Sequence, residues 1–545
     1  MRGNKIIAYD LGTGGNKASL YDAEGVCLES AFVSYETTYP RTGWHEQRPE
    51  DWWKAVVEST RKLLSSRRGE SGNIECISIS GHSLGAVPLD AHGRLLREST
   101  PIWSDTRAEN EVREFFRDRD ERSWYMRTGN GFPAACYTVF KVLWYRNNEP
   151  EMFRSTAKII GTKDYINFRL SGKLYTDYSY ASGSGVYDLT GWSYDAALVA
   201  ASGLSRELFP EIVPSSEVIG ELLPGAAEEL GLPRSVKVVC GGVDNSCMAL
   251  GARNIADGRV YTSLGSSAWI AVSSKQPVLE AERRPFVFTH VIPEMFTSAV
   301  SIFAAGSSLK WVRDTLCADL IAQAEEQGRD PYELMNEAAA RSPIGARGLL
   351  FNPSLAGGTS QEASPHIRGA FAGLDLGHRQ EDLIRACMEG IALNLGSVLG
   401  LLRDYTGLEG GTAGAEEGSI GARRSGTAGA GSVTGTETPR PEMVMVGGGS
   451  KSPLWLQIFA DVYEMDVLKT NVDQDAGSLG AAALGAVGCG LWRDFRRIDE
   501  IHEIRGRYRP IPENVASYRA LRPAFEALRR SQARLGDLLH DLRQV

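Results

Sequence analysis

Two segments far apart in the chain share one pattern: a strand-like run, a turn of small residues and a second strand-like run. The first is YDLGTGGNKASLYD, from Tyr9 to Asp22, and the second is VYTSLGSSAWIAVS, from Val260 to Ser273. Thr13 and Ser266 occupy matching places in the two turns. Such self-similarity predicts a duplicated domain, although two unrelated hairpins would leave the same short match.

The length of the chain agrees with two such units. Its 545 residues exceed what a single hydrophobic core normally holds. We expect one domain over residues 1–250 and a second over residues 251–545. Residues 409–441 are almost entirely Gly, Ala, Ser, Thr and charged residues. Because that composition cannot bury a core, we expect a flexible surface insertion within the second domain.

Composition excludes several classes of partner. The net charge of −9, without a basic cluster that also carries aromatic residues, disfavours nucleic acid as a partner. The N-terminus lacks a signal-peptide h-region, and no window reaches the roughly 18 uncharged apolar residues of a membrane span. The eight cysteines are scattered without a CxxC pair, which is typical of reduced thiols. We therefore expect a cytoplasmic protein.

The first glycine-rich turn allows three interpretations. GTGGNKAS does not satisfy the GxxxxGK[ST] pattern of a P-loop. A dinucleotide fingerprint needs a helix directly after its glycines, whereas KASLYD alternates like a strand. A tight hairpin whose backbone N–H groups form an anion-binding concavity remains. Two such hairpins from duplicated domains would hold a polyphosphate between them.

Two aspartates are candidates for the chemistry beside these turns. Asp10 directly precedes the first turn, where a carboxylate would hold Mg²⁺ next to phosphate oxygens. Asp244, in VVCGGVDN, follows a buried strand and two glycines, where it would accept the proton of an attacking hydroxyl. A helix N-cap is the alternative role for Asp244. A third glycine turn, VGGGSKSPLW, opens a helix and would lie against a nucleotide.

Taken in order, these segments resemble the FGGY carbohydrate kinases, most closely the xylulokinase branch. The similar segments are DLGTGGNK, GWHEQRPEDWW, PIWSDTRAENE, GGVDN, SLGSS, VGGGSKSPLWLQIFADV and DAGSLGAAALGA. The resemblance spans nearly the whole chain apart from the low-complexity insertion. It implies an α/β fold of two duplicated actin/hexokinase-like (ribonuclease H-like) domains around a central cleft.

The resemblance also implies a role for each matching residue. Asp244 would be the general base and Asp10 the ligand of Mg²⁺. The sugar would lie against GHSLG and the Trp–Asp–Arg segment, with the candidate substrate-binding residues His82, Ser83, Leu84, Trp103, Asp105, Arg107 and Asn245. ATP would contact Gly12, Thr13, Gly14, Gly265, Ser266, Ser267, Gly306, Gly448, Gly449 and Lys451.

The activity implied is ATP-dependent phosphorylation of a sugar hydroxyl, with a ketopentose such as D-xylulose as the substrate. One departure bears on that substrate, because xylulokinases commonly read Gly–Gln–x–His–Gly where this chain has Gly81–His82–Ser83–Leu84–Gly85. A kinase for another ketose, a polyol or an open-chain signal molecule is the alternative, as is a non-catalytic sugar-responsive binding protein. Dimers are common in the family, so a homodimer is compatible with the resemblance.

Overall fold

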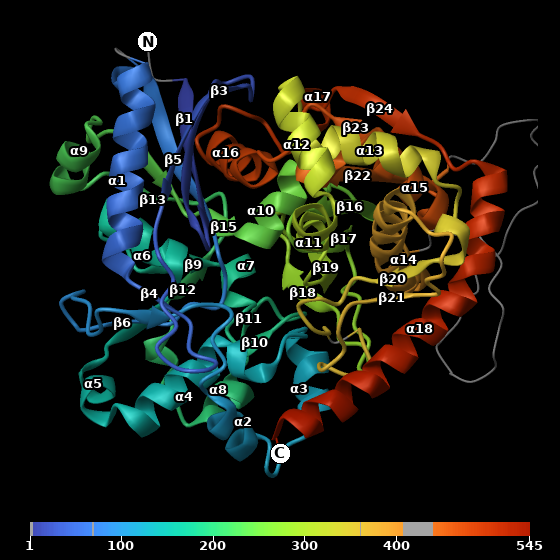
Figure 1. The fold of residues 1–545 in the computed structure, drawn as a ribbon. Helices are drawn as coiled ribbons and strands as arrows, with labels where there is room; N and C mark the ends of the chain where they lie inside the picture. The colour runs from blue at the N-terminus through green and yellow to red at the C-terminus, as the bar shows by residue number, and fades with distance from the viewer. Residues whose placement is uncertain (1–3, 68–69, 360, 407–439, 545) are drawn as a thin grey trace, which may run out of the picture.

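The computed structural model describes residues 4–67, 70–359, 361–406 and 440–544, which form an α/β protein with two large mixed sheets (Figure 1). The first sheet has the strand order β13-β14-β5-β1-β2-β3. In it β1 pairs antiparallel with β2 and parallel with β5, and β14 is parallel to β5. Its strands are β1 (Lys5–Gly12), β2 (Gly15–Tyr21), β3 (Cys27–Ser34), β5 (Ile74–Gly81), β13 (Val218–Glu221) and β14 (Lys237–Val239), and β15 (Gly242–Val243) also pairs with β5.

The second sheet repeats the same plan. Its order is β18-β19-β17-β16-β22-β23-β24, in which β16 pairs antiparallel with β17 and parallel with β22. The parallel strand β23 and the antiparallel edge strand β24 complete it, as β14 and β13 complete the first sheet. The strands are β16 (Arg259–Leu264), β17 (Ala268–Ser274), β18 (Phe286–Thr289), β19 (Phe296–Ile302), β22 (Glu442–Val446), β23 (Asp466–Thr470) and β24 (Ile504–Tyr508).

This matching order confirms the predicted fold class of two duplicated actin/hexokinase-like domains. The structure leaves the division at residue 250 as a prediction. The proposed insertion at 409–441 falls almost entirely outside the described residues. All eight cysteines are free, and six of them are buried.

Helices cover both sheets (Figure 1). In the first half they are α1 (Pro49–Ser66), α2 (Glu109–Phe115), α3 (Glu121–Thr128), α4 (Thr138–Asn148), α5 (Pro150–Ser155), α6 (Thr162–Ser171), α7 (Tyr178–Ala181), α8 (Ala196–Ser202), α9 (Pro224–Leu230) and α10 (Asp244–Gly251). In the second half they are α11 (Gly306–Leu316), α12 (Ala318–Gln327), α13 (Pro331–Arg341), α14 (Gln380–Thr406), α15 (Pro453–Tyr463), α16 (Ala476–Gly488), α17 (Arg497–Ile501) and α18 (Pro512–Gln544).

Short two-stranded pairings occur around these layers. They join β4 (Glu46–Gln47) to β7 (Thr100–Pro101), β6 (Val87–Leu89) to β8 (Lys158–Ile160), β9 (Tyr175–Asp177) to β12 (Glu211–Val213), β10 (Tyr187–Asp188) to β11 (Ser193–Tyr194) and β20 (Leu350–Asn352) to β21 (Ala370–Ala372).

The sequence pattern of α1 explains its place on the first sheet. Pro49 stands at the start of the helix, where its missing N–H costs no hydrogen bond. Trp52, Val56 and Leu63 then recur at helical spacing and are fully buried against the sheet.

One long apolar helix lies in the core. By length and composition alone, the Gln380–Gly400 part of α14 would cross a membrane, but 78% of its most apolar window is buried inside the protein. We therefore interpret α14 as a core helix of the second half.

Helices α10 and α16 lie between the two sheets and join the halves of the molecule (Figure 1). Their backbones approach closely. A Cβ atom added to Gly480 would lie 1.9 Å from the carbonyl oxygen of Cys247, and one added to Gly251 would lie 1.8 Å from that of Ala476. Only glycine allows a crossing this close.

Candidate active site

Each hairpin turn predicted to bind phosphate connects the first two strands of its sheet. Thr13 and Gly14 lie exposed between β1 and β2, and Ser266 and Ser267 lie exposed between β16 and β17. The start of α11 supports the second turn. The Gly306 N–H donates to the carbonyl oxygen of Gly265 at 2.9 Å, and a Cβ atom at residue 306 would lie 2.4 Å from that oxygen.

The third glycine turn lies at the same edge of the second sheet. Strands β16 and β22 are parallel neighbours, so the residues that follow them meet at one edge. The turn forms the short helix η5 (Gly448–Lys451). A Cβ atom added to Gly449 would lie 2.4 Å from the side chain of Leu264, directly before the β16–β17 turn. Gly448 and Lys451 are exposed beside it.

Asp10 lies next to the N-terminus of α16. The Ser80 hydroxyl donates to one of its carboxylate oxygens at 3.1 Å, and a Cβ atom added to Gly477 would lie 2.9 Å from the other. Burial raises the pKa of Asp10, while the Ser80 hydrogen bond and the charge of Lys17 act in the opposite direction. Lys17 itself forms an ion pair with Asp475.

Asp244 is the first residue of α10. The N-cap position belongs to Val243, so Asp244 does not cap the helix. Its carboxylate accepts the Asn245 N–H at 2.8 Å. Burial raises the pKa of Asp244 to about 7, and the negative charge of Asp10 adds to this effect. A carboxylate with this pKa can accept a proton near neutral pH.

A cavity of about 260 Å³ opens in front of Asp244. Its walls come from both halves of the chain. Of the predicted site residues, it brings together Thr13, Ser83, Trp103, Asp244, Asn245 and Ser267.

The GHSLG loop contributes only Ser83 to this cavity. Leu84 has a left-handed backbone with φ of 60°, and its buried side chain packs toward Gly183, so it points away from the cavity. His82 is buried behind the loop, with its ring edge-on to Trp52 at 5.6 Å. Both side chains therefore pack in the protein interior and do not line the cavity.

Asp105 and Arg107 are likewise buried and do not line the cavity. The Arg107 guanidinium is fully buried and lies 4.0 Å from the centre of the Trp44 ring. It donates to Asp105, whose carboxylate also accepts the His45 N–H at 2.7 Å. The pair thus fixes the loop that carries Trp103.

A buried lysine joins the two loops. The Lys141 Nζ donates to the carbonyl oxygen of Leu84 at 2.9 Å and to that of Ile102 at 2.6 Å. Burial lowers the pKa of Lys141 to about 8. Its hydrogen bonds hold Ser83 and Trp103 in fixed relation at the cavity wall.

Sequence reasoning missed most of the apolar wall. Phe132 and Phe286 stack face to face with ring centroids 3.8 Å apart, and both line the cavity. They come from opposite halves of the chain, and no local pattern signals their contact. The other lining residues not predicted are Met248, Ser263, Ala268, Trp269, Ser301 and Phe303.

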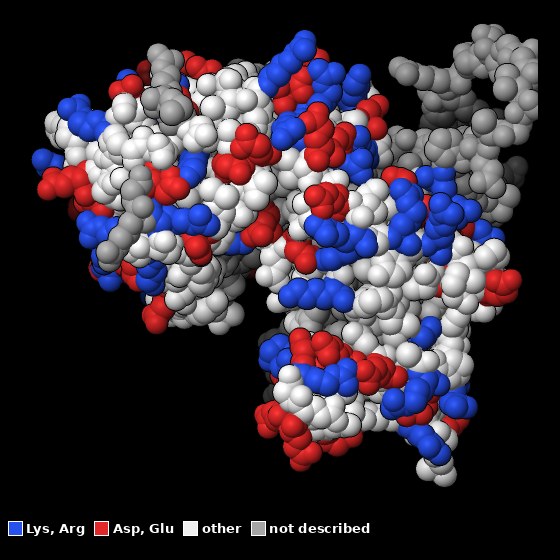
Figure 2. All heavy atoms as spheres, turned by 90° about the horizontal axis from the view of Figure 1, so that it is seen from above, with Lys and Arg blue, Asp and Glu red and all other residues white. Residues whose placement is uncertain are grey.

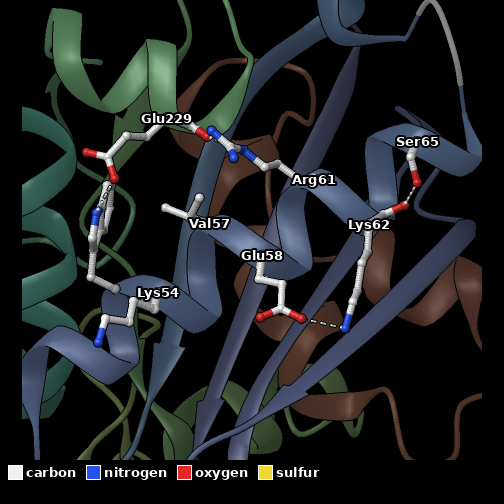
Figure 3. Close-up of a pocket in the computed structure, with 8 residues that line it drawn as sticks. Lys54, Val57, Glu58, Arg61, Lys62, Ser65 and Glu229 are labelled. Atoms are coloured by element: carbon white, nitrogen blue, oxygen red, sulfur yellow. Dashed lines mark hydrogen bonds and ion pairs between the residues drawn. The ribbon is translucent and has the colours of Figure 1, made fainter.

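A second hollow lies on the outer face of α1, away from these residues (Figure 3). The charged side chains along it have partners. Glu58 pairs with Lys62 at 2.7 Å, and the Arg61 Nε donates to the carbonyl oxygen of Glu229 at 2.7 Å. We interpret it as a solvated groove between α1 and α9.

The charges of the molecular surface are mixed. On the face seen from above, acidic and basic side chains are interspersed (Figure 2). Among the described residues, no group of three or more His, Cys, Asp or Glu side chains could hold a metal ion by itself. Mg²⁺ commonly takes one or two carboxylates together with phosphate oxygens and water, and Asp10 is the carboxylate predicted to serve in this way.

Comparison with known proteins identifies the family. Residues 5–251 match the N-terminal domain, and residues 260–489 the C-terminal domain, of the FGGY family of carbohydrate kinases. The chain belongs to this family. It is therefore a phosphotransferase that uses ATP as co-substrate, and the resemblance seen in the sequence is confirmed.

Relatives of this FGGY kinase differ in their substrates. It is 31% identical to xylulose kinase from Bacillus subtilis over 522 residues, with 95% of both chains covered. It is 27% identical to gluconokinase from the same organism over 527 residues, which covers 96% of this chain and 95% of the relative. The ligand-bound structure of xylulose kinase from Lactobacillus acidophilus superimposes with a TM-score of 0.82 at 26% identity, covering 97% of this chain and 98% of that one.

Proposed function

We propose that this FGGY kinase transfers the γ-phosphate of ATP to a hydroxyl of a neutral ketopentose such as D-xylulose. The choice of a neutral sugar rests on the charges of the residues that line the cavity. Among the described residues that line it, Asp244 is the only charged one, and none is Lys, Arg or His. The carboxylate of gluconate would face that aspartate without a cation to pair with.

Asp244 serves in this proposal as the general base. Its pKa of about 7 leaves it partly deprotonated at neutral pH and able to take the proton of the attacking hydroxyl. Asn245 and Ser83, which line the same cavity, offer hydrogen bonds to the other hydroxyls. Trp103 supplies an apolar face for the carbon skeleton.

The phosphates of ATP lie in this proposal between the two hairpin turns. Backbone N–H groups around the exposed residues Thr13 and Ser266 would form anion-binding concavities. The Trp103 Nε1 donates to the Thr13 hydroxyl at 3.0 Å, which links the first turn to the sugar wall. Gly306, Gly448, Gly449 and Lys451 would line the nucleotide. Mg²⁺, when bound at Asp10, would neutralise charge on the phosphates.

The remaining predictions are part of the same proposal. We expect a cytoplasmic enzyme that binds neither nucleic acid nor membranes, and homodimer formation is compatible with it. A kinase for another ketose, a polyol or an open-chain signal molecule is the alternative. A binding protein without turnover is disfavoured, because it would not need both Asp10 and Asp244.

The test is ADP release with magnesium ATP over pentuloses, hexuloses, pentitols, tetritols and gluconate. We expect D-xylulose or a closely related ketopentose to give the highest kcat/KM and gluconate to give at most a hundredth of it. Preference for gluconate would contradict the argument from cavity charge. Asp244→Ala should abolish transfer while nucleotide binding, measured by calorimetry, stays within a few-fold.

A further inference from the structure

A chain of hydrogen bonds runs from a buried ion cluster to the backbone next to Asp244. The cluster centres on Lys163, which is fully buried. Its Nζ lies 2.7 Å from a carboxylate oxygen of Asp164 and 3.0 Å from one of Asp177. The other Asp177 oxygen accepts the Ser179 hydroxyl and, at 2.7 Å, the Ser215 hydroxyl.

Ser179 connects this cluster to the strand that precedes Asp244. Its Oγ accepts the Val243 N–H at 2.9 Å. Because the hydroxyl proton goes to Asp177, the lone pair of the same oxygen is left for Val243. Val243 belongs to β15 and is directly bonded to Asp244. One oxygen atom therefore connects the ion cluster to the residue before the proposed base.

The two residues before this strand are also held by hydrogen bonds. The Asn167 Nδ2 donates to the carbonyl oxygen of Cys240 at 2.7 Å, and the Gly241 N–H donates to that of Ser215 at 2.9 Å. Gly242 leaves room for the contact, since a Cβ atom there would lie 3.2 Å from the Ser179 Oγ. The segment from residue 240 to 243 thus takes its position from α6 and α7 as well as from β5.

Burial of these charges needs a reason other than stability. A buried ion cluster is often no more stable than apolar residues of the same volume, because each charge loses its water. The cluster fixes the orientation of the Asp177 carboxylate. Because each of its two oxygens has its own donors, the carboxylate cannot rotate freely. A carboxylate with a fixed orientation in turn fixes the orientation of the Ser179 hydroxyl that donates to it.

We propose that Ser179 is a positioning residue, which transmits the fixed orientation of the Lys163–Asp177 pair to Val243 and so holds the Asp244 carboxylate against the sugar hydroxyl. The inference rests on the proposed role of Asp244 as the base. Transfer between oxygens depends steeply on alignment, and a displacement of about 1 Å can lower the rate about 100-fold. Ser179 is fully buried and does not line the cavity in front of Asp244.

The test compares Ser179→Ala with the matched control Ser215→Ala. Both remove a hydroxyl that donates to Asp177, but only the first leaves the Val243 N–H without its acceptor. We expect similar melting temperatures for the two variants. The kcat should fall 10- to 100-fold in Ser179→Ala and less than threefold in Ser215→Ala, with the KM for ATP within twofold of wild type in both.

Equal losses of kcat in the two variants, or full activity of Ser179→Ala, would overturn the proposal. If Ser179→Ala does not fold, the isosteric pair Ser179→Thr and Ser179→Val decides, because only the hydroxyl differs between them. The threonine variant should then exceed the valine variant at least tenfold in kcat, and equal values would refute the role.

The Asp244→Asn variant separates this inference from the proposed function. Turnover by Asp244→Asn would remove Asp244 as the base, and the proposed mechanism would fail with it. An inactive Asp244→Asn together with a fully active Ser179→Ala would overturn the positioning role alone.

Discussion

Replacing Asp244 with asparagine should stabilise the free enzyme at neutral and alkaline pH while it removes phosphoryl transfer. Asparagine has the same shape as aspartate, and its side-chain oxygen can still accept the Asn245 N–H that Asp244 accepts at 2.8 Å. The substitution therefore removes the charge and little else. A carboxylate that is kept ready to accept a proton at the cost of folding stability should show this signature.

The magnitude follows from the pKa of Asp244, which burial raises from the ordinary value of 3.8 to about 7. Three pKa units correspond to about 4 kcal/mol, at about 1.4 kcal/mol each. Because the carboxylate partly faces the cavity, water reduces this figure, and we expect about 2–4 kcal/mol.

The sign follows from proton binding. Between pH 3.8 and about 7 the folded protein holds the proton more tightly than the unfolded chain. The free energy of unfolding of the wild type therefore falls as pH rises through this window. The gain from Asp244→Asn should be near zero at pH 4 and complete above about pH 8.

Thermal unfolding of the apo protein in a chelator measures the effect. For a domain of about 250 residues, 1 kcal/mol corresponds to about 2 °C, so Asp244→Asn should melt about 4–8 °C above the wild type at pH 8. Asp90→Asn is the control, because backbone hydrogen bonds lower the pKa of that exposed carboxylate and no stabilisation is expected. A melting temperature of Asp244→Asn equal to or below wild type at pH 8 would refute the reasoning.

Three further substitutions test the site and the junction between the halves. Phe286→Ala removes one ring of the stacked pair in the cavity wall and should raise the hexulose-to-pentulose ratio of kcat/KM about tenfold; an unchanged ratio would show that the ring does not limit substrate size. Gly306→Ala places a Cβ atom 2.4 Å from the Gly265 oxygen and should raise the KM for ATP about tenfold without changing the KM for sugar; an unchanged KM for ATP contradicts this. Gly480→Ala forces α16 away from α10 and should lower both melting temperature and kcat, so wild-type values of both would contradict the role of that crossing.

The sequence was informative wherever the chemistry depends on local pattern. Both hairpins were predicted from alternation around small residues, and β1, β2, β16 and β17 confirm them. Asp10 and Asp244 stood out for the same reason, since each comes at the end of an apolar strand beside glycine. Local chemistry of this kind needs no knowledge of distant contacts.

The wall of the cavity could not be predicted in the same way, because it depends on contacts between remote segments. Leu84 was expected to face the sugar, but its left-handed backbone turns the side chain into the core. Arg107 is charged and would be expected near solvent or ligand, yet it is buried against Trp44. The stack of Phe132 on Phe286 depends on how the two halves pack, which no periodicity encodes.

The layer between the sheets is where the two halves of the site are joined. Asp10 and Asp244 both belong to the first half of the chain, whereas the turn between β16 and β17 belongs to the second half. One place where the halves meet is the crossing of α10 and α16, where Gly251 and Gly480 leave no interlocking side chains, and the stack of Phe132 on Phe286 is another. A rotation of the halves about that crossing would move the turn at Ser266 relative to Thr13, which lies in the same half as Asp10 and Asp244. In the proposed mechanism, closure would then bring the phosphates toward Asp244 and Asp10, and it would exclude water in the same movement.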